Sequence, residues 1–216
     1  MKIEASPLYK LVTDVTKIVT SKEAIKRLFR VPLYSSASYL VVANGVNSLL
    51  GFAFWIMVAR LYSAEDVGLA SAALAATGLL ASLAHLGLGM GLIRFLPTYS
   101  QNRGLMLNTV FTVGLITSVL AGVIFVAGLG FWSPALILIQ QDPFYLSAFI
   151  LFTVAATLSI HVNEALLAKR QANFILIKNL IFSLLKLILP VILVAFLQSL
   201  GIFASWGIAT WVALLL

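Results

Sequence analysis

The stretch SAEDVGLASAALAATGLLASLAHLGLGMGLIRFLP, residues 63–97, joins a clear helix start to a long apolar run and a glycine-rich end. A serine three residues before an acidic residue caps free backbone amides, and acidic residues in the first turn match the positive end of the helix dipole. About 30 helical residues would measure about 45 Å, which exceeds a hydrocarbon core of about 30 Å. Because glycine weakens a helix, we expect this one to bend or end at a hinge formed by Gly87, Gly89 and Gly91. Since glycine also lets a neighbouring backbone approach, a closely packed helix end is the alternative.

The rest of the chain also has the composition of a membrane protein. Of its 216 residues, 62% are apolar and 10% are charged, whereas soluble domains have about 25% charged residues. We therefore expect an all-α integral membrane protein, with a bundle of about six transmembrane helices in residues 36–216. The last apolar run is shorter than a full crossing, which predicts a chain cut off inside its sixth span. The predicted spans cover about residues 38–61, 67–95, 107–131, 144–167, 174–197 and 202–216.

Basic residues predict the orientation, because lysine and arginine near span ends stay on the cytoplasmic side. Residues 1–35 and the second and fourth connections carry them, whereas the third connection has none. This pattern predicts a multi-pass protein of the cytoplasmic membrane with a cytoplasmic N-terminus. Residues 1–35 predict an amphipathic helix on the membrane surface, and a loosely ordered tail is the alternative. The net charge of +7 then faces anionic membrane lipids, and the lack of a soluble basic domain argues against a nucleic-acid partner.

A family resemblance rests on residues 59–97. A basic residue precedes a short acidic loop, and a glycine, a helix of small residues, a GLG turn and an arginine before an aromatic residue follow. This order resembles the signature of polysaccharide-export flippases of the multidrug/oligosaccharidyl-lipid/polysaccharide exporter superfamily. The spacing of the remaining spans is similar to the N-terminal half of that family. The positions that carry the resemblance are Arg60, Glu65, Asp66, Gly68, Gly87 to Gly89, Arg94 and Phe95.

The resemblance implies a transport function. Members of the family move an oligosaccharide attached to a polyprenyl phosphate from the inner to the outer leaflet, and they have two lobes around a central cavity. This chain would supply one lobe. Its partners would then be a second lobe or a second protomer, the membrane lipids and the polyprenyl-phosphate-linked glycan. The resemblance implies no cofactor.

Ionisable and polar residues inside spans are the candidates for a site, since burying charge in lipid is costly and commonly marks a transport pathway. Lys186 lies near the middle of the fifth span, where it could contact a substrate phosphate; alternatively, its stem extends to the membrane surface. Asn44, Asn47 and Arg94 are further candidates for substrate binding, although asparagines also join helices and arginines anchor span ends. We expect Lys186 to face the open side of the bundle, near Asn44, Asn47 and His161.

His161 and Glu164 are three residues apart on the fourth span and so share a helix face. They could bind a proton or an ion that drives transport, or they could pair with Lys169 or Arg170 at the membrane surface. His85 is interpreted as a packing residue. The two histidines are 76 positions apart, and the chain has no cysteine and no paired carboxylates at ligand spacing. No metal site is therefore predicted.

Three functions stay open at this point. The first is the flippase lobe, the second is an exporter of small cationic drugs from the same superfamily, and the third is a non-transporting scaffold for a glycan-assembly complex. A basic cavity would count against the drug exporter, and the lack of any cavity would favour the scaffold. Because the chain has no GxxxxGK motif and few acidic residues or histidines, we expect no enzymatic activity and no catalytic residues.

Overall fold

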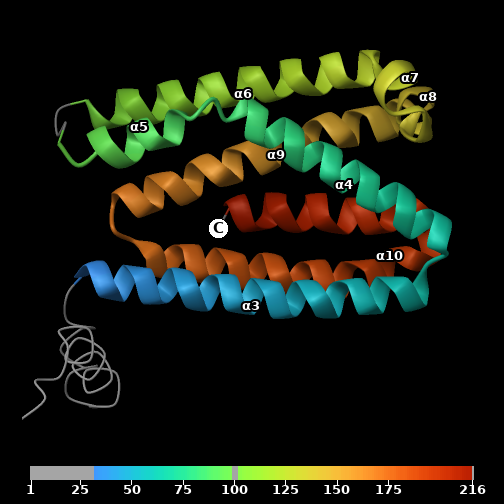
Figure 1. Ribbon diagram of the computed structural model, residues 1–216, viewed down its shortest axis with the longest axis horizontal. Coiled ribbons are helices and arrows are strands. Elements are labelled where there is room, and N and C mark those ends of the chain that lie inside the picture. The colour runs from blue at the N-terminus through green and yellow to red at the C-terminus, as the bar shows by residue number, and fades with distance from the viewer. Residues whose placement is uncertain (1–31, 99–101, 216) are drawn as a thin grey trace, which may run out of the picture.

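The computed structural model describes residues 32–98 and 102–215. Every regular element in these residues is helical, and no strand occurs among them. Five helices are long and apolar enough to cross a membrane, which confirms the expected all-α membrane bundle (Figure 1). The predicted surface segment 1–35 lies outside the described residues except for its last four, which begin the first helix. The elements are α3 (Pro32–Leu61), α4 (Ala64–Ala84), α5 (Leu88–Phe95), α6 (Arg103–Ala127), α7 (Leu129–Trp132), η1 (Pro134–Leu136), α8 (Leu138–Gln141), α9 (Pro143–Ala168) and α10 (Ala172–Leu215).

Local sequence signals set the starts of α4 and α9. At α4 the Ser63 side chain accepts a hydrogen bond from the backbone N–H of Asp66 at 3.1 Å, as the sequence predicts. At α9 the Asp142 carboxylate accepts one from the backbone N–H of Phe144 at 2.8 Å. Pro143 occupies the first helical position, where a missing N–H needs no partner. Both helices therefore begin at residues that satisfy or remove free amides.

The predicted 67–95 span is two helices with a break between them. α4 ends at Ala84, and α5 begins at Leu88. Between them Leu86 and Gly87 have left-handed φ values of 51° and 69°, a conformation that glycine adopts without steric penalty. The interruption expected near the glycines is present. It precedes the other two predicted hinge glycines, which lie inside α5.

The last helix, α10, folds back on itself. A straight helix of its 44 residues would be about 66 Å long, and positions 182 and 206 would be about 36 Å apart. Instead, the ring centroids of Phe182 and Trp206 are 5.3 Å apart. Figure 1 shows the two antiparallel arms, the second of which returns in red. The arms Ala172–Ala195 and Leu200–Leu215 correspond to the predicted spans 174–197 and 202–216.

Tyr62, in the connection between α3 and α4, holds the reversal of α10 in place. Its hydroxyl donates a hydrogen bond of 2.7 Å to the carbonyl oxygen of Pro190. Burial, and then the negative charge of Asp66, raise the pKa of this phenol, so it stays a donor. A Cβ atom at Gly201 would lie 2.6 Å from the same hydroxyl and 3.2 Å from the carbonyl oxygen of Leu193. Only glycine therefore fits this turn without displacing its neighbours.

The connections divide between the two ends of the bundle (Figure 1). The start of α3, the end of α5, the start of α6 and the α9–α10 connection lie at one end, which carries Arg94, Arg103, Lys169 and Arg170. The other end contains the α3–α4 connection, the short helices α7, η1 and α8, and the reversal of α10. α9 packs against α4, α5, α6 and α10, and α3 packs mainly against α10. The helices thus cross the bundle in alternating directions, and the predicted clustering of basic connections at one end follows from that alternation. Arg60 is the exception among the described residues, because it lies in the last turn of α3, at the other end.

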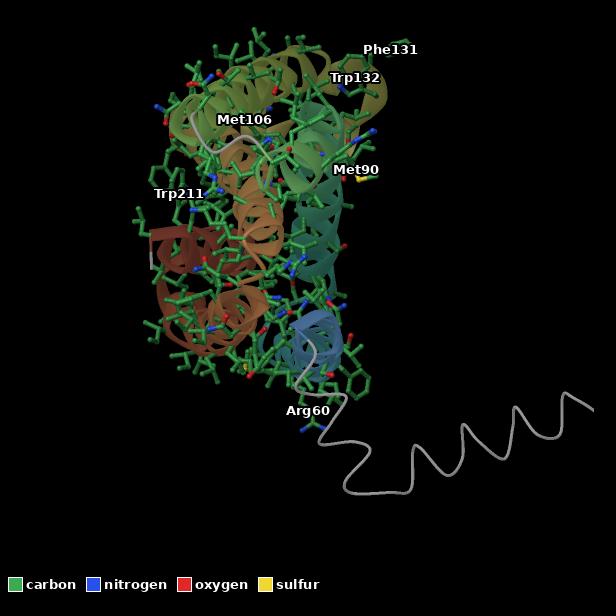
Figure 2. All side chains as sticks on the ribbon, turned by 90° about the vertical axis from the view of Figure 1, so that its left-hand side faces the viewer. Arg60, Met90, Met106, Phe131, Trp132 and Trp211 are labelled. Carbon is green, nitrogen blue, oxygen red and sulfur yellow. The ribbon has the colours of Figure 1, made fainter. Side chains whose placement is uncertain are left out.

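The outer surface of the bundle carries large apolar side chains. Figure 2 shows Phe131 and Met90 pointing away from the helices, and these side chains are 89% and 73% exposed. Inside, Phe149 is fully buried and its ring stacks near those of Phe125 and Phe203. A bundle that is apolar on both its inside and its outside is suited to a lipid environment rather than to water.

Candidate functional site

Two groups of ionisable side chains lie inside the bundle. The first consists of Lys178 and Lys186, which lie at a cavity between α3, α9 and both arms of α10. We call this cavity the lysine cavity. The second, which we call the histidine–glutamate cluster, consists of His85, His161 and Glu164, at the α4–α5 break and on α9. The residues that line the lysine cavity are Asn47, Ala156, Ser159, Lys178, Asn179, Phe182, Trp206, Thr210 and Ala213.

Lys186 is enclosed beside the lysine cavity and is only 2% exposed. Its Nζ atom is 4.9 Å from the ring centroid of Phe182 and 5.0 Å from that of Trp206. The ring of Phe54, on α3, is 6.0 Å away. Aromatic faces attract a cation at these distances. The expectation that Lys186 faces an open side of the bundle is therefore wrong, and the side chain does not extend to the membrane surface either.

Asn47 connects Lys186 to the lysine cavity. Its Oδ1 atom lies 3.4 Å from the Lys186 Nζ atom and accepts a hydrogen bond of 3.0 Å from the Ser183 hydroxyl. Asn44, one turn earlier on α3, is exposed and does not line the cavity. Arg94 is exposed near the end of α5, over the ring of Phe95. Of the four predicted substrate-binding residues, the fold thus brings two together.

Lys178 is a second buried lysine in the same place. It is 8% exposed, and its Nζ atom donates to the hydroxyl of Ser159 at 2.7 Å and to the carbonyl oxygen of the same residue at 3.1 Å. In the sequence, Lys178 stands just beyond the basic connection that holds Lys169 and Arg170, and it was not among the predicted site residues. It escaped notice because only the packing of α9 against α10 reveals that it points inward.

The lysine cavity measures about 170 Å³, and none of its lining residues is acidic. A second cavity of about 170 Å³, with mainly apolar lining, shares Lys178 and Ala213 with it. Within residues 32–98 and 102–215, neither Lys178 nor Lys186 forms an ion pair with a carboxylate. Two amines are therefore held inside the bundle with hydrogen bonds and aromatic rings but without an opposite charge.

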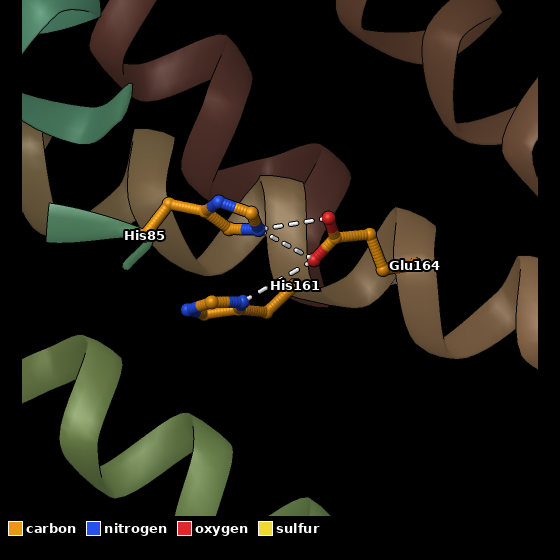
Figure 3. A group of neighbouring side chains, drawn as sticks. All are labelled: His85, His161 and Glu164. Atoms are coloured by element: carbon orange, nitrogen blue, oxygen red, sulfur yellow. Dashed lines mark hydrogen bonds and ion pairs between the residues drawn. The ribbon is translucent and has the colours of Figure 1, made fainter. Parts of the chain in front are cut away.

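The histidine–glutamate cluster is compact (Figure 3). The Nε2 atom of His85 is 2.8 Å and 2.9 Å from the two carboxylate oxygens of Glu164. The Nδ1 atom of His161 is 3.4 Å from one of them. The two rings stack with centroids 5.0 Å apart. His161 therefore lies with His85 rather than with Lys186, and Glu164 contacts the two histidines, while the alternative partners after α9 are exposed.

Small residues on the neighbouring helices make room for this cluster. A Cβ atom at Gly89, on α5, would overlap the Glu164 carboxylate, and one at Gly114, on α6, would overlap the His161 ring. Thr117, also on α6, has its hydroxyl 2.7 Å from the carbonyl oxygen of Ala84, where α4 ends. Gly89 thus serves close packing rather than bending, whereas a Cβ atom at Gly91 would meet nothing within 4 Å.

The cluster offers two imidazole nitrogens and a carboxylate, all within 4.8 Å of one another, which is a donor set that could hold a metal ion. The sequence predicts no such site, because the histidines are 76 positions apart. That separation disappears when the α4–α5 break places His85 against α9. No local motif announces the pairing, since His85 lies in the α4–α5 break and His161 lies within α9, each among apolar residues.

No protein-family model, curated protein or solved structure matches this chain. The function must therefore be argued from the two buried sites and from the resemblance carried by residues 59–97.

Proposed function

We propose that this chain is one lobe of a membrane exporter for a lipid-linked glycan that carries phosphate. The observation behind the proposal is the pair of buried amines, Lys178 and Lys186, beside a polar cavity without a carboxylate. A buried charge is costly unless it meets an opposite charge. A phosphate or pyrophosphate group supplies that charge, and it is the group by which the family that residues 59–97 resemble carries its glycans.

The surroundings of the amines suit the other parts of such a substrate. Asn47, Asn179 and Thr210 offer hydrogen-bonding groups for sugar hydroxyls along the lining of the lysine cavity. The adjacent apolar cavity, which Lys178 also lines, offers a place for the hydrocarbon next to the phosphate. Each cavity is smaller than the roughly 300 Å³ at which ligand pockets begin. A complete pathway would therefore need a second lobe or a second protomer.

The two alternative functions fit these features less well. A cationic drug would be repelled by Lys178 and Lys186, since like charges in a low dielectric interact strongly. A non-transporting scaffold gives no reason to keep two uncompensated amines inside the membrane, where apolar side chains would pack more favourably. We also propose that the end of the bundle that carries Arg94, Arg103 and Lys169 is cytoplasmic, in accordance with the positive-inside rule.

The proposal is tested by binding to the purified full chain in detergent, because one lobe does not complete a transport path. The probe is a fluorescent polyprenyl pyrophosphate that carries an oligosaccharide, and the reference lipid lacks the pyrophosphate. We expect Lys186→Ala to weaken probe binding by about a hundredfold, in line with the loss of one partner of a buried charge pair. Lys186→Arg should keep part of the binding, and Lys169→Ala, which changes an exposed lysine, should have no effect.

Membrane insertion and helical content are measured for each variant, so that a folding defect is recognised. Equal binding of the probe and of the reference lipid would overturn the proposal. Unchanged binding in a folded Lys186→Ala variant would remove Lys186 from the site. In the complete transporter, the same variant should stop glycan export.

A further inference from the structure

We propose that His85, His161 and Glu164 bind a divalent transition-metal ion such as Zn²⁺. The donor atoms of these three side chains lie within 4.8 Å of one another, and they come from two separate parts of the chain. This proposal does not rest on the proposed transport function, because it concerns different residues and a ligand of opposite charge.

The spacing of the donor atoms is close to that of a metal site. Zinc binds nitrogen and carboxylate oxygen at about 2.0–2.2 Å, so two ligands of a tetrahedral ion are about 3.4 Å apart. The distance between His161 Nδ1 and Glu164 Oε2 is already 3.4 Å. His85 Nε2 and the same carboxylate are 2.8–2.9 Å apart and would have to separate by about 0.5 Å. The donor nitrogens of the two imidazoles lie within 4.8 Å of one another and would have to approach the same distance of about 3.4 Å.

The hydrogen-bonding state of the rings is compatible with ligation. The Gly87 backbone N–H donates to His85 Nδ1 at 3.3 Å, so the neutral ring carries its hydrogen on Nε2, facing Glu164. Metal binding through Nε2 moves that hydrogen to Nδ1, which costs this long hydrogen bond and the hydrogen bond from Nε2 to the Glu164 carboxylate. Coordination of the same carboxylate by the ion replaces the second of these. His161 Nε2 is buried and has no hydrogen-bond partner among the described residues, so ligation through Nδ1 leaves no additional atom unsatisfied.

Access and donor type define the class of ion. His161 is fully buried, but the side chains of His85 and Glu164 are both 17% exposed. Glu164 lies four residues before the end of α9, or about 6 Å along the helix axis, so an ion can enter from the nearby end of the bundle. Two imidazole ligands favour Zn²⁺, Co²⁺ or Ni²⁺ over Mg²⁺ and Ca²⁺, which take oxygen ligands. Three protein ligands leave a position for water.

The experiment uses the purified full chain in detergent without a polyhistidine tag, with Co²⁺ as the probe. We expect one Co²⁺ per chain with the visible absorption of a nitrogen- and oxygen-ligated ion. Zn²⁺ should displace it and Mg²⁺ should not. His161→Ala and Glu164→Gln should each weaken Co²⁺ binding at least about tenfold. Glu65→Gln is the matched control, since it removes an exposed carboxylate at the other end of the bundle.

A second measurement needs no variant and so does not depend on variant folding. Diethyl pyrocarbonate, which modifies accessible imidazoles, should modify His85 in the metal-free chain, and Zn²⁺ should block that modification. Equal modification with and without Zn²⁺, displacement of Co²⁺ by Mg²⁺, or full Co²⁺ binding in both cluster variants would each overturn the proposal. A chain that binds Co²⁺ but not the polyprenyl probe would support this site while contradicting the proposed transport function.

Discussion

The lysine cavity and the histidine–glutamate cluster both place charge-bearing groups inside the bundle, but their local pairing differs. Among the residues that the structure describes, Lys178 and Lys186 have hydroxyl, amide and aromatic neighbours without a carboxylate, whereas Glu164 contacts two imidazoles. An amine without a counter-charge is stabilised by an anionic ligand. A carboxylate that is already hydrogen-bonded to imidazoles binds a further ligand only if that ligand replaces these hydrogen bonds. A metal ion does so by coordinating the carboxylate and the imidazoles together. The same bundle can therefore present two sites with opposite ligand preferences.

The largest expected effect concerns the side of the membrane that the end of the bundle nearest the cluster faces. The chain has no cysteine of its own, so cysteines can be introduced singly at Arg103 and Gln140, which are exposed at opposite ends of the bundle. We expect an impermeant thiol reagent to label them from opposite sides, with Arg103→Cys labelled from the cytoplasm. Labelling of both cysteines from one side would contradict the predicted orientation. Labelling of Arg103→Cys from the outside alone would place the end of the bundle nearest the cluster on the external side.

The next effect tests whether the two sites are independent. Lys178→Ala should weaken binding of the polyprenyl pyrophosphate probe by about tenfold or more and leave Co²⁺ binding unchanged, because sites without shared partners behave additively. His161→Ala should do the reverse. Both ligands are titrated against both variants by fluorescence and by visible absorption. If either variant weakens the binding of both ligands equally, the two regions form one coupled site, which would contradict the difference between them described above.

A smaller effect separates the two glycines of α5. Gly89→Ala places a methyl group on the Glu164 carboxylate, which must then move away from His85. We expect a loss of about 1–3 kcal/mol in the free energy of unfolding and weaker Co²⁺ binding. Gly91→Ala is the control, because its methyl group meets nothing within 4 Å. Thermal unfolding in detergent measures both variants, and equal unfolding temperatures would contradict the close packing described for Gly89.

The smallest effect concerns the free energy of unfolding without ligand. Lys186→Met keeps the approximate length of the side chain and removes an amine that forms no ion pair with a carboxylate in residues 32–98 and 102–215. We expect a stabilisation of about 1 kcal/mol, because buried charges are often replaced favourably by apolar side chains. Lys169→Met, at an exposed position, should change little. Destabilisation by Lys186→Met would mean that the aromatic rings and Asn47 fully offset the cost of burying the amine. Lys186 would then be as well paired as Glu164, and the difference between the two regions would disappear.

Features that depend only on residues close together in the sequence could be predicted from it. Hydropathy located the crossing segments, and the serine and acid before α4 located its start. Which asparagine points inward could not be predicted, since Asn44 and Asn47 lie one turn apart on a helix whose lipid-facing and core-facing residues are both apolar. An apolar solvent removes the amphipathic pattern that marks the buried face of a helix in water. For the same reason Lys178 gave no sign of its inward direction.

The clustering of His85 with His161 depends on tertiary structure alone. The glycines next to His85 predicted an interruption, but the sequence did not show that the interruption would direct this histidine at α9. Gly89 and Gly114 carried a signal of a different kind. Glycine within a membrane helix commonly marks close approach of another segment, and both positions lie against the ionisable side chains of α9.

The hydrogen bond from Tyr62 to the Pro190 carbonyl joins residues that are 128 positions apart. Tyr62 is therefore synthesised long before its partner. α3 also packs mainly against α10, so it must wait for its principal neighbour while α4, α6 and α9 insert. Membrane helices insert individually and then associate, and contacts between distant segments form late. The assembly of the lysine cavity, which needs Asn47 from α3 and both arms of α10, is accordingly expected to be a late step in the folding of this bundle.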